Sequence, residues 1–166
     1  MKILCILALV VTTTALAAQQ PSGIVNAYAF MREHFAGTIA VDDQGNPMQR
    51  GVDTVNLVYI ETKGNDVPTI KRAWRNGQAY QVSLLPVKQL PVQIGSTRSG
   101  ERKLVLQPTR GSRLWQLSID PVNEKGRQPA VKAYKRNDLI LEGEYKKSKF
   151  LYTIRNITML MPIPSV

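Results

Sequence analysis

Residues 69–85 read TIKRAWRNGQAYQVSLL, and this stretch decides the fold class of the chain. Two β-prone segments, 69–75 and 78–85, flank the pair Asn76-Gly77. Asparagine and glycine accept the positive φ angles of the tight turn whose twist matches that of two antiparallel strands. The sequence therefore predicts a β-hairpin with Asn76 and Gly77 at its tip.

Strand patterns continue on both sides of this hairpin. Residues 53–62 alternate Val55, Leu57 and Tyr59 with more polar positions, which predicts a half-buried strand. Residues 103–107 and 113–119 flank the connection 108–112 and predict a second hairpin. Further strands are expected at 38–41, 92–94, 139–145 and 150–160. The predicted core is Val55, Leu57, Tyr59, Trp74, Val82, Leu84, Leu104, Leu106, Trp115, Leu117, Ile119, Leu139, Leu141, Leu151 and Ile154.

Short strands separated by turn residues roughly every 8–12 positions are typical of antiparallel sandwiches and barrels. Long helical patterns between the strands are missing, which argues against a parallel α/β design. We therefore expect an all-β domain, an antiparallel two-sheet β-sandwich of immunoglobulin-like type without a disulfide. Residues 27–35 fit either a helical stripe or a strand, so we expect an extended segment or one short helical turn there.

The N-terminus has the three parts of a secretory signal peptide. Lys2 supplies a positive charge, residues 3–11 are apolar, and Ala15-Leu16-Ala17 is a small-residue cleavage pattern. We expect residues 1–17 to be this signal peptide, residues 18–36 a flexible or extended leader, and residues 37–166 a single β-sandwich domain.

Cleavage of the predicted signal peptide has consequences for the location and the cysteine content of the mature chain. The apolar run is shorter than the roughly 20 residues that cross a bilayer, so no transmembrane segment is expected in the mature chain. The expected location is periplasmic or extracellular. Cys5 is the only cysteine and leaves with the signal peptide, so no disulfide, thiol nucleophile or thiolate ligand is expected.

The positive charge of the chain is concentrated in its second half. The formal net charge is +10, and residues 98–166 carry 14 basic and 6 acidic side chains, against 7 and 6 in residues 19–97. Such an excess favours anionic partners, for example acidic lipid head groups, acidic polysaccharide or extracellular nucleic acid. The alternative is that the charge only keeps the protein soluble.

Residues that could support catalysis or metal binding are few. His34 is the only histidine, and a multi-histidine zinc site is therefore excluded. Asp42 begins a segment that resembles a calcium loop, but its glycine, Gly45, is fourth where such a loop requires the sixth position, so a turn is expected. Glu142 and Glu144 alternate along one predicted strand, which is typical of the solvent-exposed face of a half-buried strand. We expect no catalytic residue, no metal and no cofactor.

Two basic turns form the candidate binding site. If residues 103–155 run as an antiparallel meander, the turns 108–112 and 146–148 lie at the same end of the sheet. They would then form a basic patch that can hold phosphate or carboxylate groups, whereas a Greek-key crossover would separate them. The residues of this predicted patch are Arg110, Arg113, Lys146, Lys147 and Lys149.

The C-terminal residues 159–164 are apolar and contain two prolines. Because proline cannot donate a hydrogen bond within a central strand, this segment should end on a sheet edge or lie across the domain. An exposed tail would instead be a docking peptide.

One resemblance rests on the segment FAGTIAVDDQGNP at residues 35–47, on Asp53-Thr54-Val55 and on GSRLW at residues 111–115. With these features the chain resembles a group of small exported β-rich proteins of Bacteroidetes bacteria, over residues 35–120. The resemblance implies an envelope or secreted setting, and it implies no catalytic residue.

Two functions follow as expectations. The first is a non-enzymatic binding or structural module of the bacterial envelope, whose basic patch contacts an envelope protein, an anionic polymer or a lipid surface. The alternative is an exported enzyme that acts on an acidic glycan. The enzyme requires a cleft in which Asp120, Glu142 or Glu144 faces a second carboxylate.

Overall fold

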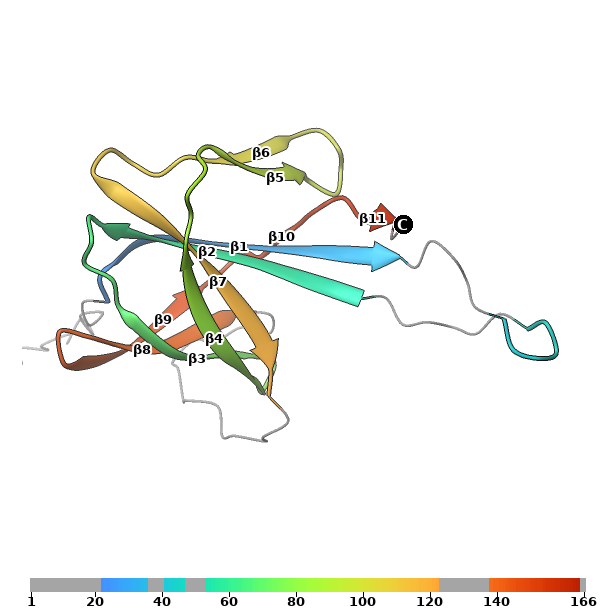
Figure 1. Cartoon of the computed structure of the whole chain (residues 1–166), viewed down its shortest axis with the longest axis horizontal. Coiled ribbons are helices and arrows are strands. Elements are labelled where there is room, and N and C mark those ends of the chain that lie inside the picture. Colours follow the sequence, from blue (N-terminus) through green and yellow to red (C-terminus); the bar gives the residue numbers. More distant parts are fainter. Residues whose placement is uncertain (1–21, 36–40, 47–52, 123–137, 165–166) are drawn as a thin grey trace, which may run out of the picture.

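The structure is a computed structural model that describes residues 22–35, 41–46, 53–122 and 138–164. Every helix or strand within these residues is a β-strand, so the predicted all-β class is confirmed (Figure 1). The strands are β1 (Ile24–Phe35), β2 (Asp53–Lys63), β3 (Thr69–Arg75), β4 (Gln78–Pro86), β5 (Val92–Ser96), β6 (Lys103–Leu106), β7 (Ser112–Pro121), β8 (Leu139–Tyr145), β9 (Ser148–Ile154), β10 (Thr158–Met159) and β11 (Ile163–Pro164). Residues 1–17, the predicted signal peptide, and most of the strand predicted at 38–41 lie outside the described residues.

The hairpin predicted around Asn76-Gly77 is confirmed. β3 and β4 pair antiparallel up to Arg75 and Gln78. Asn76 has φ 51° and Gly77 has φ 80°, so both turn residues occupy the left-handed region that asparagine and glycine tolerate. The N-terminal segment is also extended, since residues 24–35 form β1.

One large sheet has the strand order β10, β1, β2, β7, β4, β3, β8, β9, and β11 also pairs with β1. The strands from β1 to β9 in this order pair antiparallel, whereas β10 and β11 run parallel to β1. The prediction of a purely antiparallel arrangement is therefore wrong at this edge. After β9 the chain crosses to the free edge of β1, and there β10 and β11 run in the same direction as β1. The C-terminal segment thus ends on a sheet edge, as its prolines predict.

The large sheet is curled. β9 and β10 stand at opposite ends of the strand order, yet only residues 155–157 separate them. The four Cα–Cα steps from Ile154 to Thr158 span at most roughly 14 Å. The two edges of the sheet therefore lie close together, and β9 contacts β1 (Figure 1). The curl gives the sheet a concave face that encloses the larger core and a convex face.

The hairpin of β5 and β6 covers part of the convex face. Phe30 and Tyr59 pack there against Ile94 of β5 and Leu106 of β6. The prediction that β6 forms a hairpin with β7 is wrong, because β6 pairs with β5 and β7 pairs with β2 and β4. Burial of the apolar convex face outweighs the local pairing that the short connection 107–111 would favour.

Both faces of β2 are buried, which the alternating pattern does not predict. Val58 and Ile60 are 1% and 0% exposed on the concave face, and Tyr59 is 5% exposed on the convex face. Most of the predicted core residues are buried or half-buried. Val55 and Leu151 are 39% and 37% exposed, so their predicted burial is wrong.

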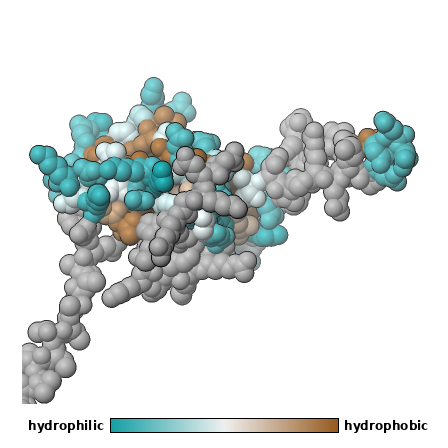
Figure 2. Space-filling model, turned by 90° about the horizontal axis from the view of Figure 1, so that it is seen from below, coloured by the Kyte–Doolittle hydropathy of each residue, from teal (hydrophilic) through white to brown (hydrophobic). Residues whose placement is uncertain are grey.

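The arrangement is thus a large curled mixed sheet with a small sheet against it. It does not confirm the two-sheet, immunoglobulin-like sandwich that the sequence predicts. On the face drawn in Figure 2, hydrophilic side chains interrupt the apolar ones. The described residues contain no helix with the length and apolar character needed to cross a membrane.

Candidate anion-binding site

Three turns meet at one end of the curled sheet, and we call this region the three-turn end. They are the β2–β3 turn (residues 64–68), the β6–β7 turn (residues 107–111) and the β8–β9 turn (residues 146–147). The Gly64 N–H donates to the Gly111 carbonyl at 3.0 Å, and Lys146 Nζ lies 3.1 Å from Asp66 Oδ2. The β2–β3 turn therefore connects the other two (Figure 1).

The two predicted basic turns share this end, although not through a meander. β4 and β3 stand between β7 and β8 in the sheet. The end of β8 nevertheless lies beside the start of β3, where Thr69 pairs with Glu144. The start of β3 follows the β2–β3 turn, which lies beside the start of β7. The pairing of β3 with β8 therefore places the β8–β9 turn beside the β2–β3 turn, and the pairing of β2 with β7 places the β6–β7 turn beside it as well.

The five predicted residues differ in their surroundings. Arg110, Arg113 and Lys147 are exposed. Lys149 lies opposite Glu144 in the β8–β9 register. Lys146 forms an ion pair with Asp66, and its Nζ also lies 5.0 Å from the centre of the Tyr145 ring.

Asp66 and Tyr145 complete this arrangement, and neither was part of the predicted patch. The Tyr145 hydroxyl donates a short hydrogen bond to Asp66 Oδ2. Hydrogen bonds from Tyr145 and Lys146 lower the pKa of Asp66, and those with Tyr145 and Asp66 raise the pKa of Lys146. Asp66 therefore neutralises part of the positive charge of Lys146. No sequence pattern marks this pairing, because 80 positions separate the two residues.

The β8–β9 turn consists of two lysines, Lys146 and Lys147, and contains no glycine. Lys146 and Lys147 have φ of 49° and 66°, the left-handed region that glycine or asparagine usually occupies. The turn therefore places two lysines in succession at the tip of the hairpin. The contact of Lys146 with Asp66 and Tyr145 holds one of them, and Lys147 remains exposed.

A buried carboxylate holds the β6–β7 turn. Glu61 of β2 is 1% exposed. It accepts hydrogen bonds from the Thr109 backbone N–H at 2.8 Å, from the Thr109 hydroxyl and from Asn26 Nδ2 at 2.8 Å. Burial alone raises the pKa of Glu61, but the hydrogen bonds outweigh burial and the pKa is lowered. Glu61 is therefore a structural anchor for the turn that carries Arg110.

A small apolar pocket of about 230 Å³ adjoins Arg113. Leu90, Leu114 and Trp115 contribute to its wall. Leu90 is 46% exposed, and Trp115 Nε1 donates to Thr62 Oγ1 at 3.0 Å. Arg113 thus combines a positive charge with a neighbouring apolar surface.

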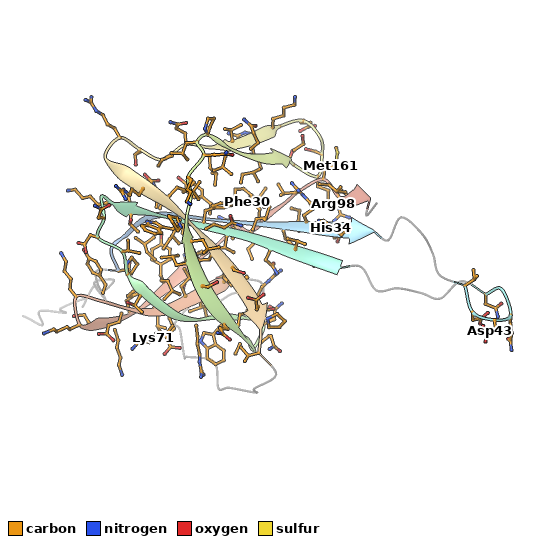
Figure 3. The ribbon with its side chains drawn as sticks, viewed as in Figure 1. Phe30, His34, Asp43, Lys71, Arg98 and Met161 are labelled. Atoms are coloured by element: carbon orange, nitrogen blue, oxygen red, sulfur yellow. The ribbon has the colours of Figure 1, made fainter. Side chains whose placement is uncertain are left out.

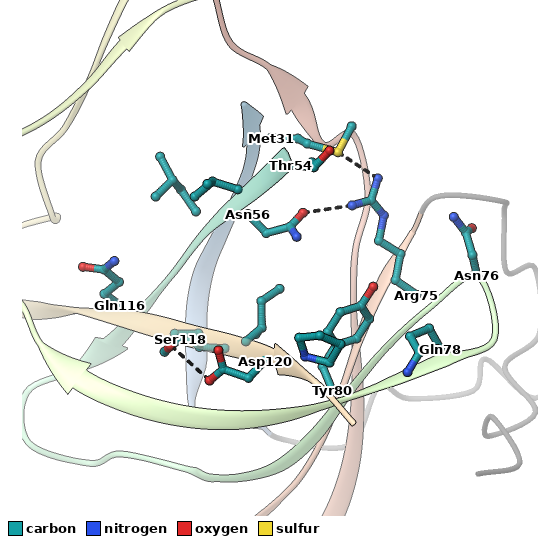
Figure 4. A pocket seen from close by; sticks show the side chains of 15 residues that line it. Met31, Thr54, Asn56, Arg75, Asn76, Gln78, Tyr80, Gln116, Ser118 and Asp120 are labelled. Carbon is teal, nitrogen blue, oxygen red and sulfur yellow. Dashed lines mark hydrogen bonds between the residues drawn. The ribbon is translucent and has the colours of Figure 1, made fainter. Parts of the chain in front are cut away.

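A larger pocket, of about 730 Å³, opens between β2 and β7 (Figure 4). Asp120 is the one carboxylate among the described residues that line it. Glu142 accepts a hydrogen bond from Trp74 Nε1 at 3.1 Å, and Glu144 pairs with Lys71 at 2.9 Å. The pair of facing carboxylates that a glycan hydrolase requires does not occur around this pocket in the described part of the chain.

A set of metal ligands is also missing from the part of the chain that the structure describes. It contains no group of three or more histidine, cysteine, aspartate or glutamate side chains that could hold a metal ion. Asp42 Oδ1 instead accepts from the backbone N–H groups of Gln44 and Asn46 at 2.9 and 2.8 Å. These hydrogen bonds, those from Asn46 foremost, lower the pKa of Asp42. The segment is a turn, as its residue types predict.

Comparison of the chain with models of protein families, with curated proteins and with solved structures finds no match.

Proposed function

We propose that this protein is an exported, non-enzymatic binding module of the bacterial envelope that contacts an anionic partner through the three-turn end. The observation that carries the proposal is the bridging of the basic β6–β7 and β8–β9 turns by the β2–β3 turn. Export is supported by the signal-peptide pattern of residues 1–17. The classification of the fold as an immunoglobulin-like sandwich also remains part of this proposal.

Exposed cations at the three-turn end outnumber the exposed acids. Glu61 is buried beneath Thr109, and Asp66 and Glu144 are already paired with Lys146 and Lys71. Arg110, Arg113 and Lys147 are exposed, and a partner would meet their charges together with that of the exposed Lys149. Guanidinium and ammonium groups on turns can bind phosphate or carboxylate groups of an extended anion without a deep pocket.

A charge-reversal experiment tests the proposal. The variant R110E/R113E/K147E should lose binding to heparin and to phosphatidylglycerol vesicles, while its melting temperature stays close to that of the parent. Lys146 is left unchanged, because a glutamate there would face Asp66 and disturb the turn. Binding by the parent should weaken steeply with added salt, since exposed charges are screened.

The control is a variant with the same net charge, R102E/K103E/R155E. Arg102 and Lys103 lie on or next to the β5–β6 turn, and Arg155 follows β9 at the end away from the β8–β9 turn. Arg98 of the β5–β6 turn is left unchanged, because it lies 3.7 Å from Glu33 and a glutamate there would face that acid. Figure 3 shows Arg98 at the opposite end of the molecule from Lys71, which is on β3 near the three-turn end. This variant should keep most of the binding. Equal losses in both variants would mean that only net charge matters, and unchanged binding in R110E/R113E/K147E would refute the proposal.

A further inference from the structure

The large sheet opens between β2 and β7. Their pairing ends at Val58 and Leu117. β2 extends beyond this point along β1 to Asp53, and β7 extends beyond it along β4 to Pro121. The two strands therefore diverge and leave a wedge between them (Figure 4).

The pocket of about 730 Å³ occupies this wedge, and polar side chains line much of it. Its volume is within the range that small-molecule sites have, roughly 300–1,000 Å³. Amide, hydroxyl and carboxylate groups face it from three strands, which suits a hydrophilic ligand. These polar residues include Asn56, Tyr80, Gln116, Ser118 and Asp120.

Arg75 brings a positive charge to the mouth of the pocket. Its Nη1 donates to Asn56 Oδ1 at 2.9 Å, and its Nη2 donates to Met31 Sδ at 3.2 Å. A thioether sulfur is a weak acceptor, and Arg75 Nε is buried without a hydrogen-bond partner. Within the described residues, no carboxylate forms a salt bridge with Arg75. The guanidinium is thus oriented by two neutral groups and keeps its charge available.

We propose that this wedge pocket binds the carboxylate-bearing unit of an acidic saccharide. Arg75 binds the carboxylate, because its planar guanidinium matches that group. Ser118 and Asp120, whose side-chain oxygens lie 3.4 Å apart, accept hydrogen bonds from sugar hydroxyls. The Tyr80 ring offers an apolar surface to the C–H face of the sugar.

This site is separate from the three-turn end. Arg75 ends β3 at the Asn76-Gly77 turn, whereas the three-turn end lies beside Thr69, where β3 begins. The two sites therefore lie at opposite ends of β3. A failure of one proposal leaves the other to be tested by itself.

A titration followed by NMR tests the wedge site, with glucuronate as the probe and isotope-labelled protein without residues 1–17. Glucuronate should shift the amide signals of Tyr80, Gln116 and Ser118. Glucose should bind at least about tenfold more weakly, because it lacks the charge-assisted hydrogen bonds to Arg75. Acetate should also bind more weakly, because it lacks the hydroxyl groups.

Two variants separate binding from folding. R75Q should remove the preference for glucuronate over glucose. S118L leaves Arg75 and its hydrogen bonds intact and should abolish binding by filling the pocket, and the R110E/R113E/K147E variant should bind glucuronate as the parent does. Equal binding of glucose and glucuronate, shifts confined to the three-turn end, unchanged binding by S118L, or binding of a glutamate-rich peptide in place of glucuronate would each overturn the proposal.

Discussion

The buried Glu61 carboxylate holds the β6–β7 turn in place through hydrogen bonds. Its oxygens accept from Thr109, Asn26 and Tyr28, and no lysine or arginine forms an ion pair with it in the described residues. Burial raises the pKa of Tyr28, and the negative charge of Glu61 raises it further. The carboxylate thus remains ionised and the phenol neutral, which suits the hydrogen bond between them.

The variant E61Q should be less stable than the parent by about 2 kcal/mol at neutral pH, because it loses charge-assisted hydrogen bonds at a buried site. The folded-state pKa of Glu61 is lowered, so the folded protein binds fewer protons than the unfolded chain does. Its stabilising contribution is complete above the unfolded value of about 4.3 and is lost as the pH falls through the folded pKa. Urea unfolding should therefore show that the difference between parent and E61Q narrows below about pH 4.

E144Q is the matched control for this measurement. Glu144 forms an exposed ion pair with Lys71, and exposed ion pairs contribute little to stability. E144Q should therefore cost less than E61Q at neutral pH. If E61Q were as stable as the parent at neutral pH, Glu61 would not be the anchor of the β6–β7 turn.

At the scale of strands, Gly143 of β8 leaves no room for a side chain next to β3. A Cβ atom at this position would lie 2.5 Å from the Thr69 carbonyl oxygen and 2.7 Å from Phe150 Cζ. The oxygen belongs to the backbone of β3, and Phe150 is 3% exposed, so neither neighbour can move freely. The close approach also positions Tyr145 and Lys146 against Asp66, since they follow Gly143 on β8 and its turn.

G143A should therefore cost about 2–3 kcal/mol, which is the range for an overpacked site. G77A is the comparison, because Gly77 has φ 80° and no atom within 4 Å of a Cβ position. Only backbone strain opposes that substitution, and about 1–2 kcal/mol is expected. Chemical denaturation of both variants measures the difference. A smaller loss in G143A than in G77A would mean that β3 and β8 are farther apart than the structure has them.

At the scale of the whole molecule, the C-terminal segment joins parts that are distant in sequence. The Leu160 N–H donates to the Met31 carbonyl at 2.8 Å, and the Met161 N–H donates to the Ser96 carbonyl at 2.9 Å. The segment thus connects β1 with the end of β5. Leu160 is 1% exposed and packs against the convex-face core that β5 and β6 cover.

L160A should lower the free energy of unfolding by about 2–5 kcal/mol, as truncation of a buried leucine does. Its neighbour Met161 is 46% exposed, so M161A should change stability by less than about 0.5 kcal/mol. Thermal unfolding of the two variants distinguishes a packed segment from a docking peptide. Similar, small effects of both substitutions would favour the docking peptide.

Features that depend only on neighbouring residues follow directly from the amino-acid sequence. Asn76-Gly77 specifies its turn because the φ angles belong to those two residues alone. The alternation in residues 113–119 correctly places Trp115, Leu117 and Ile119 on one face, since strand geometry has a period of two. The positions of most strands and the exposure of Arg110, Arg113 and Lys147 follow from the same local rules.

Beyond the Asn76-Gly77 hairpin, the choice of neighbouring strands depends on long-range packing. β6 lies on β5 rather than beside β7 because Leu106 covers Phe30 and Tyr59 on the convex face. Such burial depends on residues far apart in the chain, and no local pattern records it. The contact of Asp66 with Lys146 also depends on residues far apart in the chain. So does the wedge at Arg75, which exists because β2 pairs with β1 and β7 pairs with β4 beyond the last residue pair of β2 and β7. A strand's local sequence sets its conformation, whereas its partners follow from the arrangement that buries the most apolar surface while pairing the backbone.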